Sequence, residues 1–206
     1  MIDIVREIEA VQRTVGTGPT AAGEGKRVTL RRTYKAAIDD VWDALTNPTR
    51  VGRWFLPISG DYRVGGTFQF EGNAGGTIVS CDRPKRLEVT WGDPSSIVVV
   101  ELTAVGEEAT TFELIHTAPV PDEMWAEYGP GAVGVGWEGG LLGLELHLKG
   151  KSVDDPIAWQ LSAEGRAYNT ASSEAWGEAN RAAGVSDDVV ARNIASTTSF
   201  YTTPPA

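Results

Sequence analysis

Residues 38–66 read IDDVWDALTNPTRVGRWFLPISGDYRVGG, and this stretch decides the fold. It predicts a short helix that opens at Asp39 or Asp40, because carboxylates stabilise the positive end of a helix. The helix breaks at Asn47, which caps a second helical turn with Pro48 at its favoured first position. Elements this short bury little surface against each other, so they must lie over something larger.

The larger element is a series of strands. Apolar residues alternate within 67–71, 86–91 and 110–117, and residues 97–102 are dense in β-branched side chains. An earlier strand is predicted over 27–34. Successive strands joined by short turns are typical of an antiparallel meander.

A long helix is predicted over residues 132–149, where apolar residues recur at steps of three and four. The segment contains glycines that each cost about 1 kcal/mol relative to alanine, so tertiary packing must offset them. The glycines either let the sheet approach closely or leave room beside the helix. The strands and this helix together indicate an α+β fold, with a curved antiparallel sheet around the helix and a cavity between them.

The composition is that of an ordinary globular protein of 206 residues with a net charge of -10. No run of lysine or arginine interrupts this acidity, which argues against nucleic acid as a partner. The lone cysteine, Cys81, cannot form an internal disulfide, and we interpret it as a buried structural thiol in a reducing cytoplasm. We expect no signal peptide and no membrane partner, since residues 132–148 are too short and too interrupted to span a bilayer.

Three segments are expected along the chain. Residues 1–25 form a helical arm and linker, residues 26–150 the central domain, and residues 151–206 a helical extension. Within the arm, apolar residues at helical spacing predict a helix over 1–15, and the glycine-rich 16–25 reads as the linker. The sequence leaves open whether the arm docks on its own domain or on the second subunit of a homodimer.

Six motifs, in order, carry a resemblance to a known family. They are VWDALTNP (41–48), RWF (53–55), DYRVGGTFQF (61–70), PKRLEVTW (84–91), TFELIH (111–116) and GWEGGLLGL (136–144). The chain resembles the START-like (SRPBCC) superfamily, whose helix-grip fold is that of the birch pollen allergen. Within it, the chain is similar to the branch named after the C-terminal domain of the activator of heat-shock protein 90 ATPase. The resemblance implies a sheet gripping the long helix around an apolar cavity, and it fixes no reaction, because one fold hosts many functions.

Ten residues are candidates for binding a ligand in that cavity, because a binding cavity needs apolar walls and a few placed polar groups. The alternative for each is that it fills the core, as aromatic residues commonly do. The candidates are Trp54, Phe55, Phe68, Phe70, Trp91, Phe112, Leu114, His116, Trp137 and Leu141.

His116 is the sharpest polar candidate, since alternation puts it on the same face as Phe112 and Leu114. An inward histidine could hold a ligand oxygen or move a proton, and the alternative is a histidine hydrogen-bonded within the core. His147, near the end of the long helix, suits a structural or solvent role. No cysteine cluster joins the two histidines and no nucleotide-binding fingerprint is present, so we expect no metal and no cofactor.

The leading hypothesis is binding of a small hydrophobic ligand, with no catalytic residue assigned. A second hypothesis is an enzyme resembling the polyketide cyclases or aromatases of the superfamily, which would need two inward ionisable groups facing each other across the cavity. A third is protein interaction, as in the co-chaperone that names the branch. It ranks low, because the resemblance covers only that protein's C-terminal domain and residues 1–25 form only an arm. The sequence thus favours binding over catalysis.

Overall fold

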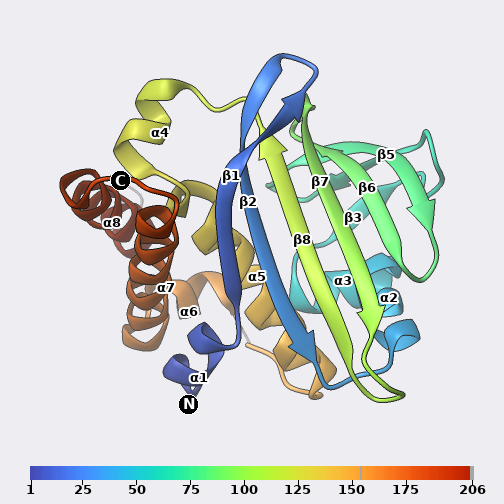
Figure 1. The fold of residues 1–206 in the computed structure, drawn as a ribbon. Helices are drawn as coiled ribbons and strands as arrows, with labels where there is room; N and C mark the ends of the chain where they lie inside the picture. The colour runs from blue at the N-terminus through green and yellow to red at the C-terminus, as the bar shows by residue number, and fades with distance from the viewer. Residues whose placement is uncertain (154, 205–206) are drawn as a thin grey trace.

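An eight-stranded antiparallel sheet is the framework of the protein (Figure 1). The structure is a computed structural model that describes residues 1–153 and 155–204. The strands follow the order β1-β2-β8-β7-β6-β5-β4-β3, and every neighbouring pair is antiparallel. They are β1 (Gln12–Thr20), β2 (Gly23–Tyr34), β3 (Ile58–Gly60), β4 (Thr67–Phe70), β5 (Gly75–Asp82), β6 (Arg86–Trp91), β7 (Asp93–Ala104) and β8 (Thr110–Ala118).

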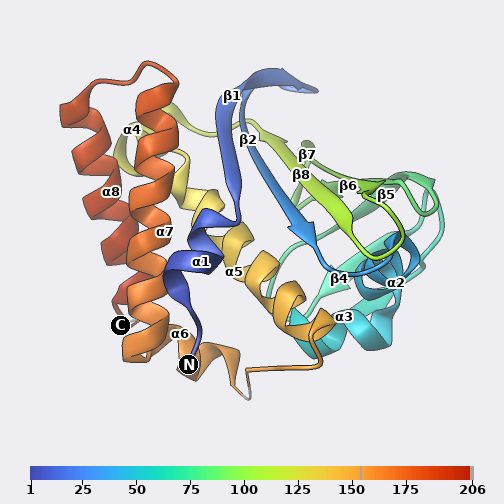
Figure 2. The ribbon, with the colours of Figure 1, turned by 60° about the horizontal axis from the view of Figure 1, so that its bottom comes forward.

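The long helix α5 lies between the sheet and the pair formed by α7 and α8 (Figure 2). Helices α2 and α3 contact α5 and lie in Figure 2 at the end of the molecule away from α7 and α8. The helices are α1 (Ile4–Glu9), α2 (Ile38–Thr46), α3 (Pro48–Trp54), α4 (Asp122–Tyr128), α5 (Gly131–Leu148), α6 (Pro156–Leu161), α7 (Ala163–Ala182) and α8 (Asp187–Thr202). The predicted helix-grip fold is confirmed.

Apolar and polar side chains alternate along the strands, and the apolar ones form the core on the face of the sheet predicted from the sequence. Leu30 and Tyr34 on β2, and Phe112 and Leu114 on β8, are buried on the face of the sheet that α5 covers. Irregular pairing in β5 and again near Trp91 in β6 interrupts the ladder, and such bulges bend a strand. The sheet therefore curves around α5 and leaves space beside the helix.

The break between α2 and α3 is built as the sequence predicts. The Asn47 side chain accepts a hydrogen bond from the Thr49 backbone N–H at 3.1 Å, and Pro48 is the first residue of α3. This sharp turn folds α3 back over the groove, so that Trp54 at the end of α3 faces α5. The fold therefore brings the aromatic end of a short helix to the long one.

The N-terminal segment corrects two predictions. The helix expected over 1–15 covers only Ile4–Glu9, and the linker expected over 16–25 forms a β-hairpin of β1 with the start of β2. The glycines fit close contacts here, since a Cβ at Gly18 would lie 2.0 Å from Arg27 Nη2. The domain boundary expected at residue 25 thus falls within β2.

The C-terminal extension packs against the long helix around a buried ion pair between β1 and α5. Glu138 on α5 is fully buried, and Arg13 on β1 donates to both of its carboxylate oxygens, the Nη2–Oε2 distance being 2.9 Å. Ser172 on α7 donates to the same carboxylate at 2.9 Å, and the Tyr168 hydroxyl donates to the Glu138 carbonyl. Three segments far apart in sequence therefore meet at one carboxylate. The domain boundary predicted at residue 150 remains a prediction.

Candidate functional site

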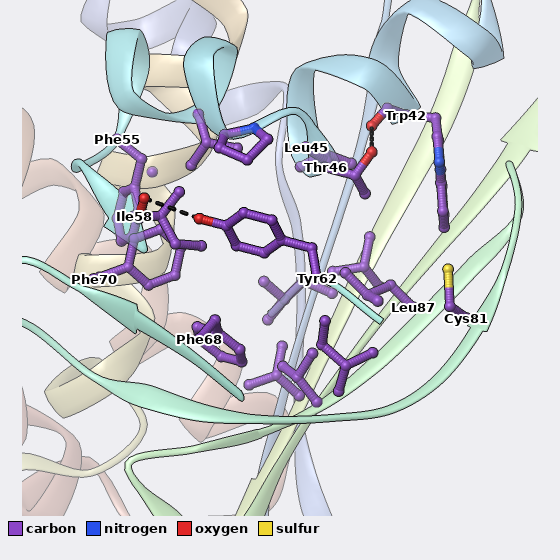
Figure 3. A pocket seen from close by; sticks show the side chains of 18 of the residues that line it. Trp42, Leu45, Thr46, Phe55, Ile58, Tyr62, Phe68, Phe70, Cys81 and Leu87 are labelled. Carbon is purple, nitrogen blue, oxygen red and sulfur yellow. Dashed lines mark hydrogen bonds between the residues drawn. The ribbon is translucent and has the colours of Figure 1, made fainter. Parts of the chain in front are cut away.

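A cavity of about 490 Å³ lies between the sheet, α2, α3 and α5 (Figure 3). Its size is within the range of ordinary small-molecule sites, about 300–1,000 Å³. The walls come from both short helices, from β3 to β8 and from one face of α5. The break at Asn47 and the curvature of the sheet together create this space.

Nine of the ten candidate residues line the cavity. They are Trp54, Phe55, Phe68, Phe70, Trp91, Phe112, Leu114, Trp137 and Leu141. The six rings from α3, the residue after it, β4, β6 and α5 form a continuous aromatic wall. Within it, Phe55 meets Phe70 edge-on at 4.9 Å between centroids, and the Trp91 and Trp137 centroids are 4.8 Å apart. Such ring contacts stabilise a wall beyond the area that they bury. A role of these residues in binding remains a prediction.

His116 points inward but does not line the cavity. Trp137 stands between it and the space, donating from its indole Nε1 to His116 Nδ1 at 3.0 Å. His116 Nε2 then carries the proton and donates to Ser96 Oγ at 2.8 Å. Burial lowers the pKa of His116 to about 4, so the ring is neutral at pH 7. The expected anchor for a ligand is instead a group that orients Trp137.

We expect His116 to make the protein less stable as the pH falls from 6.5 towards 4. Below pH 6.5 the unfolded chain protonates this histidine, whereas the folded protein keeps it neutral down to about pH 4. The unfolded state binds more protons in this window, so the stabilisation is complete above pH 6.5 and about 2 kcal/mol of it is lost by pH 5. Urea unfolding at pH 7 and pH 5 measures the loss in the wild type and in His116→Gln. An equal loss in free energy of unfolding in the two proteins would refute the role of His116 in this pH dependence.

The mouth of the cavity is made by residues that the sequence analysis did not select. Tyr62 and Val64, in the turn before β4, line the cavity while remaining 44% and 54% exposed. Figure 3 shows the Tyr62 ring lying across the space, and its hydroxyl donates to the Ile58 carbonyl at 3.0 Å. Cys81, interpreted from sequence as buried, is exposed and lines the same cavity. Turn residues have no periodic pattern that marks them as lining a cavity.

The glycines of α5 serve both of the purposes considered from the sequence. A Cβ at Gly143 would lie 2.6 Å from the Trp54 carbonyl oxygen, so this glycine allows α3 to approach. Gly140 lines the cavity, and a Cβ there would meet only the Phe55 ring at 3.9 Å. Gly139 is exposed with no atom near its Cβ position. One helix therefore offers a cavity-facing glycine beside a solvent-facing one.

Residues 1–153 and 155–204 include no helix with the length and hydropathy of a membrane span. Nor do three or more His, Cys, Asp or Glu side chains gather there in a way that could hold a metal ion.

Comparison with known proteins places this fold and cavity in context. A family model for the Activator of Hsp90 ATPase homolog 1-like proteins matches residues 35–149. The crystal structure of CalU16 from Micromonospora echinospora is 35% identical, with a TM-score of 0.68 over 82% of this chain and 98% of that chain. Its solution NMR structure gives 34% identity and a TM-score of 0.69 over 86% and 97% of the two chains.

A more distant structural relative is DynU16, described as a protein in the dynemicin biosynthetic locus. It is 26% identical with a TM-score of 0.51, and the match covers 61% of this chain and 48% of that chain. Among curated proteins, none matches the chain. The comparisons thus give a family and a fold.

Proposed function

Since the chain belongs to the family of Activator of Hsp90 ATPase homolog 1-like proteins, we propose that it binds a small hydrophobic molecule in the cavity between the sheet and α5. The aromatic wall carries this proposal. Trp54, Trp91 and Trp137 would contact the ligand with broad apolar surfaces, in a space large enough for a compact organic molecule. The position of DynU16 in a biosynthetic locus is consistent with a small-molecule ligand.

The lining supports binding rather than acid–base catalysis. His116 lies behind Trp137, with both ring nitrogens engaged, so it offers no proton to a molecule in the cavity. No aspartate or glutamate from the described part of the chain lines this space. A pair of carboxylate or histidine side chains, the usual acid and base of a cyclase-like reaction, is therefore missing from the described walls. A homodimer and a cytoplasmic location remain predictions from the sequence.

We expect Gly140→Leu to weaken binding of a hydrophobic fluorescent probe, phenylnaphthylamine, by about tenfold or more. A leucine at this position would extend past Phe55 into the cavity and occupy the volume that the ligand needs. Leucine is a good helix former, so the variant should fold at least as well as the wild type. Fluorescence titration measures the dissociation constant.

Gly139→Leu is the matched control, because it adds the same side chain one residue earlier, where the helix faces solvent. It should bind the probe as the wild type does. Equal binding by all three proteins would show that the probe lies elsewhere and would reject the cavity as the site. Native mass spectrometry of the protein purified from its own source would then identify any molecule that it carries.

A further inference from the structure

The charged residues of the cavity lining are all of one sign. The chain carries a net charge of -10, yet the two charged side chains that line the cavity are Arg63 and Arg83. The acidic residues that dominate the surface do not reach this lining in the described part of the chain. An apolar space whose charged lining residues are all cationic favours anions over cations.

Both arginines lie at the mouth rather than in the depth of the cavity. Arg63 is in the turn that also carries the exposed Tyr62 and Val64, and Arg83 follows directly after β5. Both side chains are exposed, so their guanidinium groups remain hydrated while bordering the apolar space. A charged group of a ligand could reach them without burial of an unpaired charge.

The two guanidinium groups remain available to an incoming anion. Arg63 has one partner, Asp61 at 2.7 Å, in an ion pair so exposed that it holds the arginine only weakly. No carboxylate of the described residues lies within ion-pairing distance of Arg83. Asp43 is ion-paired with Arg50 at 3.0 Å, which lowers the pKa of its carboxyl group, and it lies near enough for the charge of Arg83 to add to that lowering.

Three polar groups of the cavity walls already have partners within the protein. The Trp54 indole N–H donates to the Ala44 carbonyl at 2.9 Å, and the Thr46 hydroxyl donates to the Trp42 carbonyl at 2.8 Å. The Trp137 indole is engaged with the neutral His116 ring. These three groups offer a ligand no free donor, whereas the hydrated guanidinium groups at the mouth do.

We propose that the ligand is an amphipathic anion, whose apolar body fills the aromatic cavity and whose carboxylate or similar oxyanion lies at the mouth within reach of Arg63 or Arg83. The proposal rests on the proposed binding function and adds the chemical class of the ligand. Guanidinium groups suit it, because their planar array of donors matches a carboxylate and stays charged at every physiological pH.

The test compares two dyes that share one apolar body. Phenylnaphthylamine is neutral, and anilinonaphthalene sulfonate is the same body with one added sulfonate that stands in for the carboxylate. We expect the wild type to bind the sulfonate dye about tenfold more tightly than the neutral dye. Raising the salt concentration should weaken only the sulfonate dye, since both arginines are exposed to screening.

The double variant Arg63→Gln/Arg83→Gln should lose about tenfold in affinity for the sulfonate dye and keep its affinity for the neutral one. Lys85→Gln is the matched control: it removes one positive charge from the same turn as Arg83 but does not line the cavity. The control should bind both dyes as the wild type does.

Three results would overturn the proposal. In the first, the sulfonate dye binds the wild type no more tightly than the neutral dye does. In the second, the double variant still binds the sulfonate dye more tightly than the neutral dye, or Lys85→Gln loses this difference in affinity as well. In either case binding of the neutral dye, sensitive to Gly140→Leu, would leave the cavity function standing. In the third, neither dye binds, which would reject the proposed function and this inference together.

Discussion

Arg13→Met is expected to lower the free energy of unfolding by about 3–5 kcal/mol, because it leaves the charge of Glu138 buried without its partner. Glu138 is fully buried, and burial raises the pKa of its carboxyl group while the guanidinium of Arg13 opposes that rise. Arg13 also donates to the carbonyls of Val11 and Ile8, so its loss frees those acceptors too. Urea unfolding at pH 7 measures the change.

The double variant Arg13→Met/Glu138→Gln separates the buried charge from the lost packing. A neutral amide at position 138 can still accept a hydrogen bond from Ser172, so the double variant should be more stable than Arg13→Met alone. If the two variants unfold at the same urea concentration, the cost does not come from an unpaired charge.

Trp176→Ala is expected to lower the free energy of unfolding by about 3–5 kcal/mol. The substitution removes the largest fully buried side chain, which packs between α7 and α5, and leaves a cavity in its place. The indole lies against Gly134, where an added Cβ would be 2.2 Å from Trp176 Cε2. Thermal or urea unfolding measures the loss. A loss below 1 kcal/mol would mean that the extension contributes little to the core.

Gly134→Ala provides the complementary half of this experiment. In the wild type it should destabilise the protein by about 1–3 kcal/mol through overpacking against the indole. In the Trp176→Ala background the clash is gone, and alanine should then stabilise α5 by up to about 1 kcal/mol through its higher helix propensity. A change of sign between the two backgrounds is the expected signature of direct contact.

The walls of the cavity could be predicted from the sequence because they lie on regular elements. Alternation along β8 assigned Phe112 and Leu114 to the inner face, and helical spacing assigned Trp137 and Leu141 to one side of α5. Both predictions need only the period of the element and the side that the core occupies.

The mouth and the N-terminal hairpin could not be predicted in this way. Arg63 and Arg83 lie in turns, where no period says which side chain borders a space. The glycines of 16–25 suggested a flexible linker, but Gly25 allows close packing, since its Cβ would lie 2.6 Å from the Ala118 carbonyl oxygen. A glycine required by a neighbouring strand and a glycine that permits flexibility look the same in a single sequence.

The burial of Glu138 could not be predicted from the sequence either. Helical spacing places Glu138 away from the apolar stripe of α5. If the domain stood alone, this side of the helix would face water. Glu138 is buried because α7 covers that side, and only the tertiary structure reveals that Arg13 and Ser172 meet it there.

The position of this carboxylate has a consequence for the order of events during translation. Arg13 is synthesised before Glu138, and Ser172, which covers the pair, lies 34 residues after Glu138. Until then the ion pair of the nascent chain stays open to water, and α5 lacks its outer cover. Burial of this charge must therefore wait until α7, which follows α5 in the chain, has been synthesised.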